Sequence, residues 1–261
     1  MSRQSPERPL RVWLTGATSG IGLALLEALV SRGDQVIATG RNSDRLDELR
    51  RAHGESVIPL AGDVTSPEEC RYLAAQLASM APIDWAVLNA GTCEYMDIDA
   101  FDAELVSRVV NTNIVGTARS IEAALPALRN SVGEHERPLL AIVSSSAWWF
   151  PFTRAEAYGA SKAGLTYFAE SLRADLAPEG IDVSVVSPGF VKTPLTDQND
   201  FPMPFLMEAD DAARVMVRGL TKHQRDIHFP KRFTWSLKLI ACLPRSIRDR
   251  MAAAMARNNT D

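Results

Sequence analysis

A glycine-rich turn near the N-terminus constrains the fold of this chain more than any other feature. The turn, Thr15-Gly16-Ala17-Thr18-Ser19-Gly20-Ile21-Gly22, lies between a short apolar run at 10–14 and an apolar run with helical spacing at 23–30. Glycines permit a tight turn, and the N-terminus of the following helix offers free N–H groups and a positive dipole end. The order strand, turn, helix therefore predicts a phosphate-binding loop, although the same glycines would also serve a turn without a ligand.

Strand-like apolar runs recur along the chain and alternate with helix-like runs. After 10–14 they lie at 35–39, 57–60, 85–88, 139–143, 182–187 and 227–229. Such alternation is typical of βαβ units, in which helices cover both faces of a parallel sheet. The 261 residues suffice for one sizeable domain with a well-buried core. We therefore expect an α/β fold with a doubly wound parallel sheet of about seven strands.

The residues after the second expected strand bear on the choice of dinucleotide. In dinucleotide-binding folds an acidic residue about 20 positions after the glycines binds the ribose 2′-hydroxyl, whereas an arginine accommodates a 2′-phosphate. Gly40 and Arg41 stand at that place, and no acid does. The planar, permanently charged guanidinium of Arg41 suits a phosphate, and Arg45 is placed to share the role. This predicts NADP(H) in preference to NAD(H), unless Arg41 is only a solvated turn residue.

Tyr158 and Lys162 form a candidate acid/base pair. They lie four positions apart at the start of an amphipathic run, 158–176, so a helix would place them on one face. A free tyrosine has a pKa near ~10, and a fixed positive charge nearby lowers it. We expect the pair to transfer protons at neutral pH, although the same spacing also occurs on solvated helices.

Seven segments of the chain, among them the glycine turn and the Tyr158/Lys162 pair, fall in the order typical of one family. They are Thr15 through Gly22, Asp63-Val64, Asn89-Ala90-Gly91, Asn113-Ile114-Val115-Gly116, Ser145, Tyr158 with Lys162, and Pro188-Gly189-Phe190-Val191-Lys192-Thr193. Together they resemble the short-chain dehydrogenase/reductase (SDR) family in its single-domain form. The resemblance runs from Leu10 to Thr193.

This resemblance implies a Rossmann-type fold and hydride transfer between a nicotinamide cofactor and a carbonyl/alcohol pair. It makes Tyr158 the proton donor and gives Ser145 the role of stabilising the substrate oxygen. Lys162 would lower the pKa of Tyr158 and hold the ribose of the nicotinamide. Asn113 would hold a water that relays protons from Lys162 to solvent. It assigns cofactor binding to Gly16, Thr18, Ser19, Gly20, Ile21, Gly22, Arg41, Asp63, Val64, Asn89, Ala90, Gly91, Tyr158, Lys162, Pro188, Gly189, Val191 and Thr193. It places the adenine beside Asp63-Val64. The four histidines lie outside every motif, so no metal site is expected.

Two apolar segments bear on the substrate. Residues 148–152 read Trp-Trp-Phe-Pro-Phe, and residues 201–207 read Phe-Pro-Met-Pro-Phe-Leu-Met. The family lines its substrate pocket with the first region and carries a mobile lid in the second. We therefore expect a bulky apolar carbonyl or alcohol, although both segments would equally suit core or subunit packing.

The C-terminal region differs in charge from the rest of the chain. The whole chain has a net charge of −4, yet residues 221–261 hold nine Lys and Arg against three acids, among several aromatic and aliphatic residues. We expect residues 1–229 to form the NAD(P)-binding domain, with its catalytic site and lid, and residues 230–261 a helical extension. Residues 229–257 either pack on the domain or a neighbouring subunit, or make a weak contact with a membrane surface.

The expected function is that of an NADP-dependent oxidoreductase. A membrane-surface oxidoreductase of lipid-like substrates and a non-catalytic NADP-binding regulatory protein remain alternatives. We expect a homodimer or homotetramer and no nucleic-acid partner. The polar first nine residues and the scattered Cys70, Cys93 and Cys242 favour a cytoplasmic protein, peripherally membrane-bound if the tail makes that contact.

Overall fold

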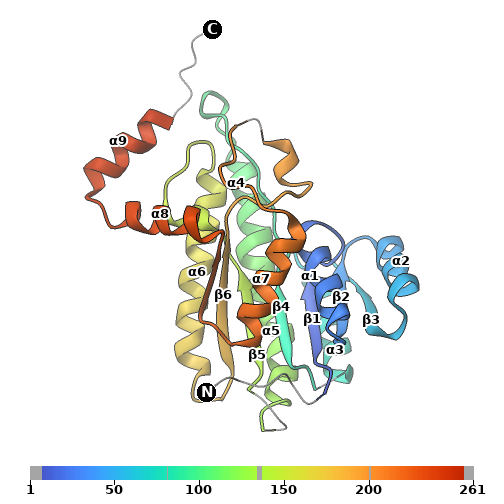
Figure 1. Ribbon diagram of the computed structural model, residues 1–261. Helices are drawn as coiled ribbons and strands as arrows, with labels where there is room; N and C mark the ends of the chain where they lie inside the picture. The colour runs from blue at the N-terminus through green and yellow to red at the C-terminus, as the bar shows by residue number, and fades with distance from the viewer. Residues whose placement is uncertain (1–7, 81, 134–136, 200, 256–261) are drawn as a thin grey trace.

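One parallel sheet forms the centre of the protein (Figure 1). The computed structural model describes residues 8–80, 82–133, 137–199 and 201–255. Within these residues seven strands pair in the order β3-β2-β1-β4-β5-β6-β7, all in parallel. The strands are β1 (Arg11–Thr15), β2 (Gln35–Gly40), β3 (Val57–Ala61), β4 (Trp85–Leu88), β5 (Leu139–Val143), β6 (Asp182–Pro188) and β7 (Asp226–Phe229). The prediction of a doubly wound sheet of about seven strands is confirmed.

The central strands are apolar along their length because helices cover both faces of the sheet. Every residue of β4 and β5 is buried, as expected for parallel strands enclosed on two sides. The strand order reverses direction between β1 and β4. In open sheets of this kind such a reversal creates a crevice at the carboxyl ends of the strands, where ligands bind.

Two apolar cores lie on opposite faces of the sheet. One includes Leu25, Leu46 and Met216, which come from α1 (Gly20–Ser31), α2 (Ser43–His53) and α7 (Ala209–Thr221). The other includes residues of α3 (Pro67–Met80), α5 (Gly116–Arg129) and α6 (Glu156–Leu176). A further helix, α4 (Ala103–Val110), continues into α5 through the π-helical turn Asn111–Val115. Each parallel strand pair thus has the helical crossover that it requires.

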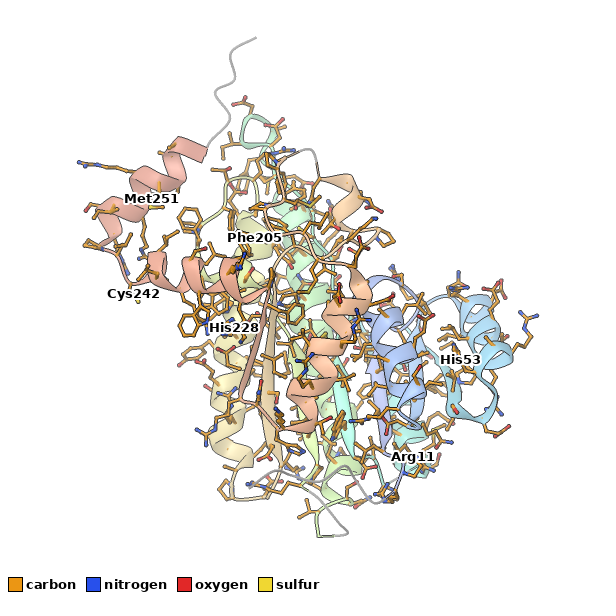
Figure 2. The ribbon with its side chains drawn as sticks, viewed as in Figure 1. Arg11, His53, Phe205, His228, Cys242 and Met251 are labelled. Carbon is orange, nitrogen blue, oxygen red and sulfur yellow. The ribbon has the colours of Figure 1, made fainter. Side chains whose placement is uncertain are left out.

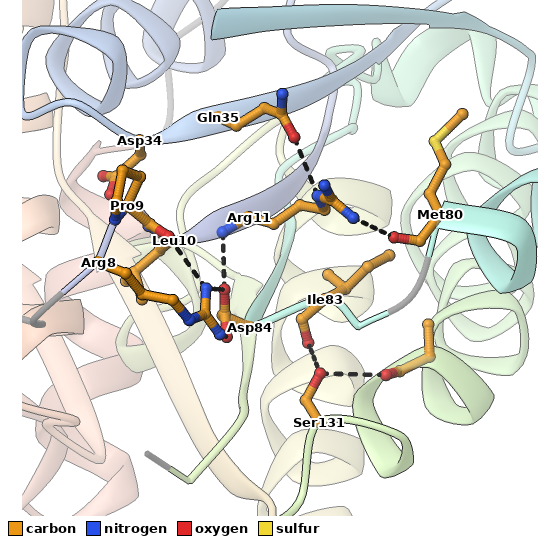
Figure 3. A network of polar contacts seen from close by, with 11 residues as sticks. Arg8, Pro9, Leu10, Arg11, Asp34, Gln35, Met80, Ile83, Asp84 and Ser131 are labelled. Atoms are coloured by element: carbon orange, nitrogen blue, oxygen red, sulfur yellow. Dashed lines mark hydrogen bonds and ion pairs between the residues drawn. The ribbon is translucent and has the colours of Figure 1, made fainter. Parts of the chain in front are cut away.

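A polar network holds the end of the sheet at which the strands begin, on the side away from the crevice (Figure 3). Arg8 forms an ion pair with Asp84 at 2.7 Å, and Asp84 also accepts a hydrogen bond from the backbone N–H of Arg11 at 2.7 Å. The Arg11 side chain donates to Gln35 at 2.9 Å, and Ser131 donates to the Ile83 carbonyl at 2.7 Å. These contacts join the starts of β1, β2 and β4 to the end of α5. The end of the sheet away from the crevice is therefore held by side chains that have no part in the site.

The chain ends in two helices beyond β7, α8 (Lys231–Ala241) and α9 (Arg245–Met255) (Figure 1). Phe233 and Leu237 of α8 are buried against Trp149 and Phe150, which follow β5. The helical extension expected at 230–261 is thus helical as far as Met255, and its last residues, 256–261, lie outside the described residues. No helix in the described part of the chain is both long and apolar enough to span a membrane.

Candidate active site

The glycines of the turn after β1 stand where side chains would be strained or would collide with neighbouring atoms. Gly16 and Gly20 have φ values of +65° and +53°, which L side chains rarely adopt. A Cβ atom at Gly22 would lie 2.0 Å from the Gly16 carbonyl oxygen, and one at Gly16 would lie 2.9 Å from Cα of Ala90. The turn is therefore compact because its three glycines carry no side chain, and it leads directly into the N-terminus of α1.

The Asn89-Ala90-Gly91 segment after β4 fastens this turn. The Thr15 hydroxyl accepts hydrogen bonds from the backbone N–H groups of Asn89 and Ala90 at 3.0 and 3.1 Å. The Asn89 side-chain amide donates to the carbonyls of Thr15 and Gly16, both at 3.2 Å. The amide group of Asn89 thus holds the glycine turn, which sequence reasoning did not foresee.

An open hollow lies beside the glycine turn at the end of β2. It is lined by Thr18, Arg41, Asn42 and Ser43, and no ion pair within the described residues engages Arg41. A Cβ atom at Gly40 would lie 2.8 Å from the Thr18 methyl, so a larger residue there would close the hollow. Arg45, expected to share the role of Arg41, pairs instead with Glu48 at 2.6 Å.

The Asp63-Val64 pair lies just after β3, near the same end of the sheet. Asp63 accepts hydrogen bonds from the backbone N–H and the hydroxyl of Thr65, both at 2.8 Å. Val64 is buried, and a Cβ atom at Gly116 would lie 3.0 Å from its methyl group. The contacts of Asp63 and Val64 thus tie this turn to Thr65 and to the start of α5.

Ser145, Tyr158 and Lys162 meet at the carboxyl end of β5. Tyr158 and Lys162 lie one turn apart in α6, and Tyr158 and Ser145 line the same pocket. The Lys162 ammonium donates to the Val143 carbonyl at 3.0 Å and lies 5.7 Å from the centre of the Tyr158 ring. The neighbouring Ser144 is turned the other way, because it donates to the Lys162 carbonyl at 3.0 Å. Of these two serines, Ser145 is the one that lines the pocket.

Burial dominates the ionisation of this group. It raises the pKa of the half-buried Tyr158 above its ordinary value, with a smaller contribution from Cys93, and the hydrogen bond to Ser145 offsets only part of the rise. Burial also lowers the pKa of Lys162 to about 8. The expectation that Lys162 brings the Tyr158 pKa below its usual range is therefore wrong for this structure. Desolvation penalises both charged forms more than the pair stabilises them.

Asn113 lies in the π-helical turn, and both N–H groups of its side-chain amide are hydrogen-bonded. Its amide nitrogen donates to the Thr92 carbonyl and to the Ser161 hydroxyl, both at 2.9 Å, and its amide oxygen accepts from the Thr92 N–H at 2.8 Å. The Asn113 carbonyl accepts from Thr117 at 2.8 Å and has a second lone pair. A water held by Asn113 would therefore bind this carbonyl or the second lone pair of the amide oxygen.

The segment from Pro188 to Thr193 crosses from β6 to the glycine turn. Gly189 donates to the Phe229 carbonyl at 2.6 Å, and Val191 pairs with Met207 in a short parallel bridge. A Cβ atom at Gly20 would lie 3.2 Å from the Thr193 side chain. The expected cofactor residues from both halves of the sheet thus meet along one crevice.

A pocket opens beside Ser145 and Tyr158. Its walls are largely apolar and come from Phe152, Phe190, Leu195, Phe201 and Phe233, while Cys93, Tyr95 and Asn199 add polar groups. Sequence reasoning named Phe152 and Phe201 within apolar segments but missed Tyr95, Asn199 and Phe233. No local pattern marks those three, because they come from three separate loops and helices.

Only part of each apolar segment faces this pocket. Trp149 and Phe150 are buried against α8 instead. In the 201–207 segment Phe205 is 54% exposed and lies close to α8 (Figure 2), with its ring 6.5 Å from that of Phe233. Packing and pocket lining, posed as alternatives, thus both occur within the same segments.

Comparison with known proteins agrees with this geometry. A family model described as short chain dehydrogenase matches residues 11–201. An uncharacterized oxidoreductase of Myxococcus xanthus is 37% identical over 92% of this chain and 94% of its own length. The 11-beta-hydroxysteroid dehydrogenase 1A of Arabidopsis thaliana is 30% identical over 85% of this chain and 68% of its own.

A solved structure extends the comparison to the whole fold. A short chain dehydrogenase of Burkholderia cenocepacia in complex with NADP has a TM-score of 0.82 at 23% identity, covering 97% of this chain and 100% of that one. Residues 11–201, which the family model matches, contain the glycine turn and the Ser145, Tyr158 and Lys162 cluster. The chain therefore belongs to the short chain dehydrogenase family and is an oxidoreductase that acts on CH–OH groups with a nicotinamide cofactor.

Proposed function

We propose that this protein is an NADP-dependent oxidoreductase that interconverts a bulky, apolar carbonyl compound and its secondary alcohol. The observation that carries the proposal is the pocket itself. Ser145 and Tyr158 contribute hydroxyl groups, and the rest of the lining is largely apolar, with four phenylalanines and Leu195. Such a pocket favours a substrate with one polar reacting group on an apolar body.

The crevice has the features that a dinucleotide requires. The glycine turn at Gly16, Gly20 and Gly22 and the α1 N-terminus would hold the pyrophosphate. Asp63-Val64 would bound the adenine, and Asn89-Ala90-Gly91, Pro188–Thr193, Tyr158 and Lys162 would hold the nicotinamide half. The cofactor supplies or accepts the hydride, and the protein supplies orientation and proton transfer.

In the direction of reduction, Tyr158 donates its proton to the substrate oxygen. Its raised pKa keeps the hydroxyl protonated at neutral pH, and a buried donor beside the oxygen needs no further solvent reorganisation. Ser145 donates a second hydrogen bond to the same oxygen as negative charge develops there. Lys162 stabilises the tyrosinate that forms, and a water held by Asn113 would return a proton to it.

The preference for NADP over NAD rests on the hollow at Arg41. A 2′-phosphate bound there would meet the exposed guanidinium of Arg41, the Thr18 hydroxyl and the N-terminus of α2. Gly40 leaves the space open and brings no carboxylate to repel the phosphate. The hollow therefore offers charge and room to an anion, and nothing that would favour a bare ribose hydroxyl.

A panel of apolar ketones, aldehydes and secondary alcohols, followed by the absorbance of NADPH, tests the reaction. We expect turnover to rise with the size of the apolar group, and small polar carbonyls to react poorly. NADPH binding without turnover of any member would contradict the proposal and favour the regulatory alternative. Light scattering in the same preparation decides between homodimer and homotetramer.

One observation favours the membrane-surface alternative as a second candidate. Trp235 and Leu239, one turn apart on α8, are 61% and 71% exposed, in a region rich in lysine and arginine. An apolar stripe among basic residues suits the surface of an anionic bilayer. Co-sedimentation with anionic vesicles at low salt should be lost in Trp235→Ser but not in Tyr167→Ser, which removes an aromatic ring that is 75% exposed on α6. Failure of the unmodified protein to sediment would exclude this candidate.

A further inference from the structure

Tyr95 connects three segments that surround the pocket. It follows β4, and its hydroxyl donates to the side-chain oxygen of Asn199 at 2.8 Å. Its ring meets Phe201 edge to face at a centroid distance of 5.5 Å. The Arg154 guanidinium, from the segment before α6, lies 5.7 Å from the centre of the ring. One side chain therefore contacts both the α6 approach and the segment after Thr193.

The segment after Thr193 is fixed at its two ends and depends on Tyr95 at its middle. Lys192 N–H donates to the Met207 carbonyl at 2.9 Å, and Met207 N–H donates to the Phe190 carbonyl at 3.0 Å. These two bonds close the base of a loop whose described residues, 193–199 and 201–206, we call the lid. Asn199 and Phe201 stand near its middle, and both contact Tyr95. Phe201 also lies 6.1 Å from the Phe190 ring.

The hydrogen bond between Tyr95 and Asn199 is the strong polar contact at this point of the lid. The Asn199 amide nitrogen donates to the Met203 sulfur at 3.2 Å, and a thioether is a weak acceptor. Leu195, Thr196, Asn199 and Phe201 all line the pocket. The position of the Asn199 side chain therefore sets the position of one pocket wall.

Tyr95 is also coupled to the catalytic end of the pocket. Cys93, two residues before it, lines the same pocket as Tyr95 and Tyr158. Cys93 and Tyr95 follow Gly91, whose Cβ position is 3.4 Å from the Lys162 ammonium. The lid is thus connected to the reacting end of the pocket through a short, continuous segment, 91–95.

We propose that Tyr95 is a positioning residue that fastens the middle of the lid to the pocket and thereby determines how tightly a substrate is held. Its hydroxyl does not touch the reacting atoms, and Tyr158 remains the proton donor. The kinetic part of this inference rests on the proposed function, whereas the attachment of the lid does not. Loss of the hydroxyl frees the lid, so binding weakens while the chemical step is preserved.

Hydrogen exchange of the lid amides, read by mass spectrometry without substrate, tests the attachment directly. Tyr95→Phe keeps the ring and its contacts and removes only the hydroxyl. A net hydrogen bond of ordinary strength predicts exchange in the lid about 2- to 12-fold faster. Tyr167→Phe removes the same atom from an exposed tyrosine and should leave lid exchange unchanged. Equal lid exchange in Tyr95→Phe and the unmodified protein would overturn the proposal.

A double-variant comparison separates a specific contact from a general loss of order. Asn199→Ala removes the acceptor, so it should accelerate lid exchange as Tyr95→Phe does, and the two together should add little to either alone. Additive effects would contradict the contact. If Tyr95→Phe were to lose its thermal transition, Asn199→Ala alone would carry the test.

Kinetics on a substrate found in the panel complete the experiment. We expect Tyr95→Phe to raise KM by the same factor as lid exchange and to leave kcat nearly unchanged. A fall in kcat at constant KM would place Tyr95 in the chemical step and overturn the positioning role. If the unmodified protein turns over a substrate but Tyr95→Phe leaves lid exchange unchanged, the lid contact is rejected and the proposed function stands. Altered exchange without turnover of any panel member would reject only the proposed function.

Discussion

Gly22→Ala should disable the cofactor loop by adding a single methyl group. The new Cβ would lie 2.0 Å from the Gly16 carbonyl oxygen, against an ordinary contact of 3.4–4 Å, so the two backbones must separate by about 1.4 Å. It would also lie 2.6 Å from the Asn89 amide nitrogen, which holds the turn through that same carbonyl. The methyl group would therefore displace the turn and also disturb the Asn89 hydrogen bond that holds it.

The size of the effect follows from the cost of overpacking a rigid site. Inserting a methylene into well-packed structure costs about 1–3 kcal/mol. If that cost falls on the cofactor-bound state, the Kd for NADPH rises by about 5- to 160-fold. If part of it falls on folding, the thermal midpoint drops instead, so both quantities must be measured on the same preparation.

Titration calorimetry with NADPH and a thermal melt provide the assay, and Gly159→Ala is the matched control. A Cβ at Gly159 meets no atom closer than 3.9 Å, and this glycine lies in α6. Its Kd should not change, and its melting temperature should hold or rise because alanine is the better helix former. A Gly22→Ala protein with unaltered Kd and unaltered melting temperature would refute the argument.

Three further predictions follow from other parts of the crevice. Arg41→Asp should shift the ratio of Kd values for NADP and NAD toward NAD, and equal affinities in the unmodified protein would deny Arg41 its role. Burial lowers the pKa of Lys162 to about 8, so its cation is present below that pH. The rate of reduction should therefore fall as pH rises through about 8, and a rate that is flat to pH 10 would contradict a need for the cation. Asn89→Ala removes two donated hydrogen bonds from the glycine turn, so both melting temperature and NADPH affinity should fall; full retention of both would show that the bonds are dispensable.

The sheet could be predicted from the sequence because each strand is marked by a short run of neighbouring residues. Runs such as 139–143 are apolar throughout, and the turn from Thr15 to Gly22 separates strand from helix at fixed spacing. The expected strands differ from the observed ones by at most one residue at each end. β1, for example, begins at Arg11 and ends at Thr15, one residue later than expected at each end.

The pocket could be predicted only in part, because its residues meet through the tertiary fold. Tyr95 and Asn199 are about a hundred positions apart and no periodicity joins them. The sequence also carries no measure of burial, which is why the direction of the Tyr158 pKa was predicted wrongly. A charge at four-residue spacing is visible in the sequence, whereas the desolvation that outweighs it is not.

The C-terminal helices lie between these two cases. Phe233 and Leu237 form the buried face of α8, whereas Trp235 and Leu239, at the same helical spacing, are exposed, so the spacing alone does not tell the two faces apart. What the buried face packs against depends on the loop after β5, which only the structure places. The exposed face is what keeps the membrane-surface candidate open to test.

The turnover of Tyr158→Phe tests the central claim most directly. The substitution keeps the ring and removes the hydroxyl that we assign as proton donor, and general acid/base groups contribute about 10²–10⁴-fold. With a ketone from the panel and saturating NADPH, we expect kcat to fall by at least about 100-fold while the Kd for NADPH changes little. A Tyr158→Phe protein that reduces the same ketone at a near-normal rate would contradict the account.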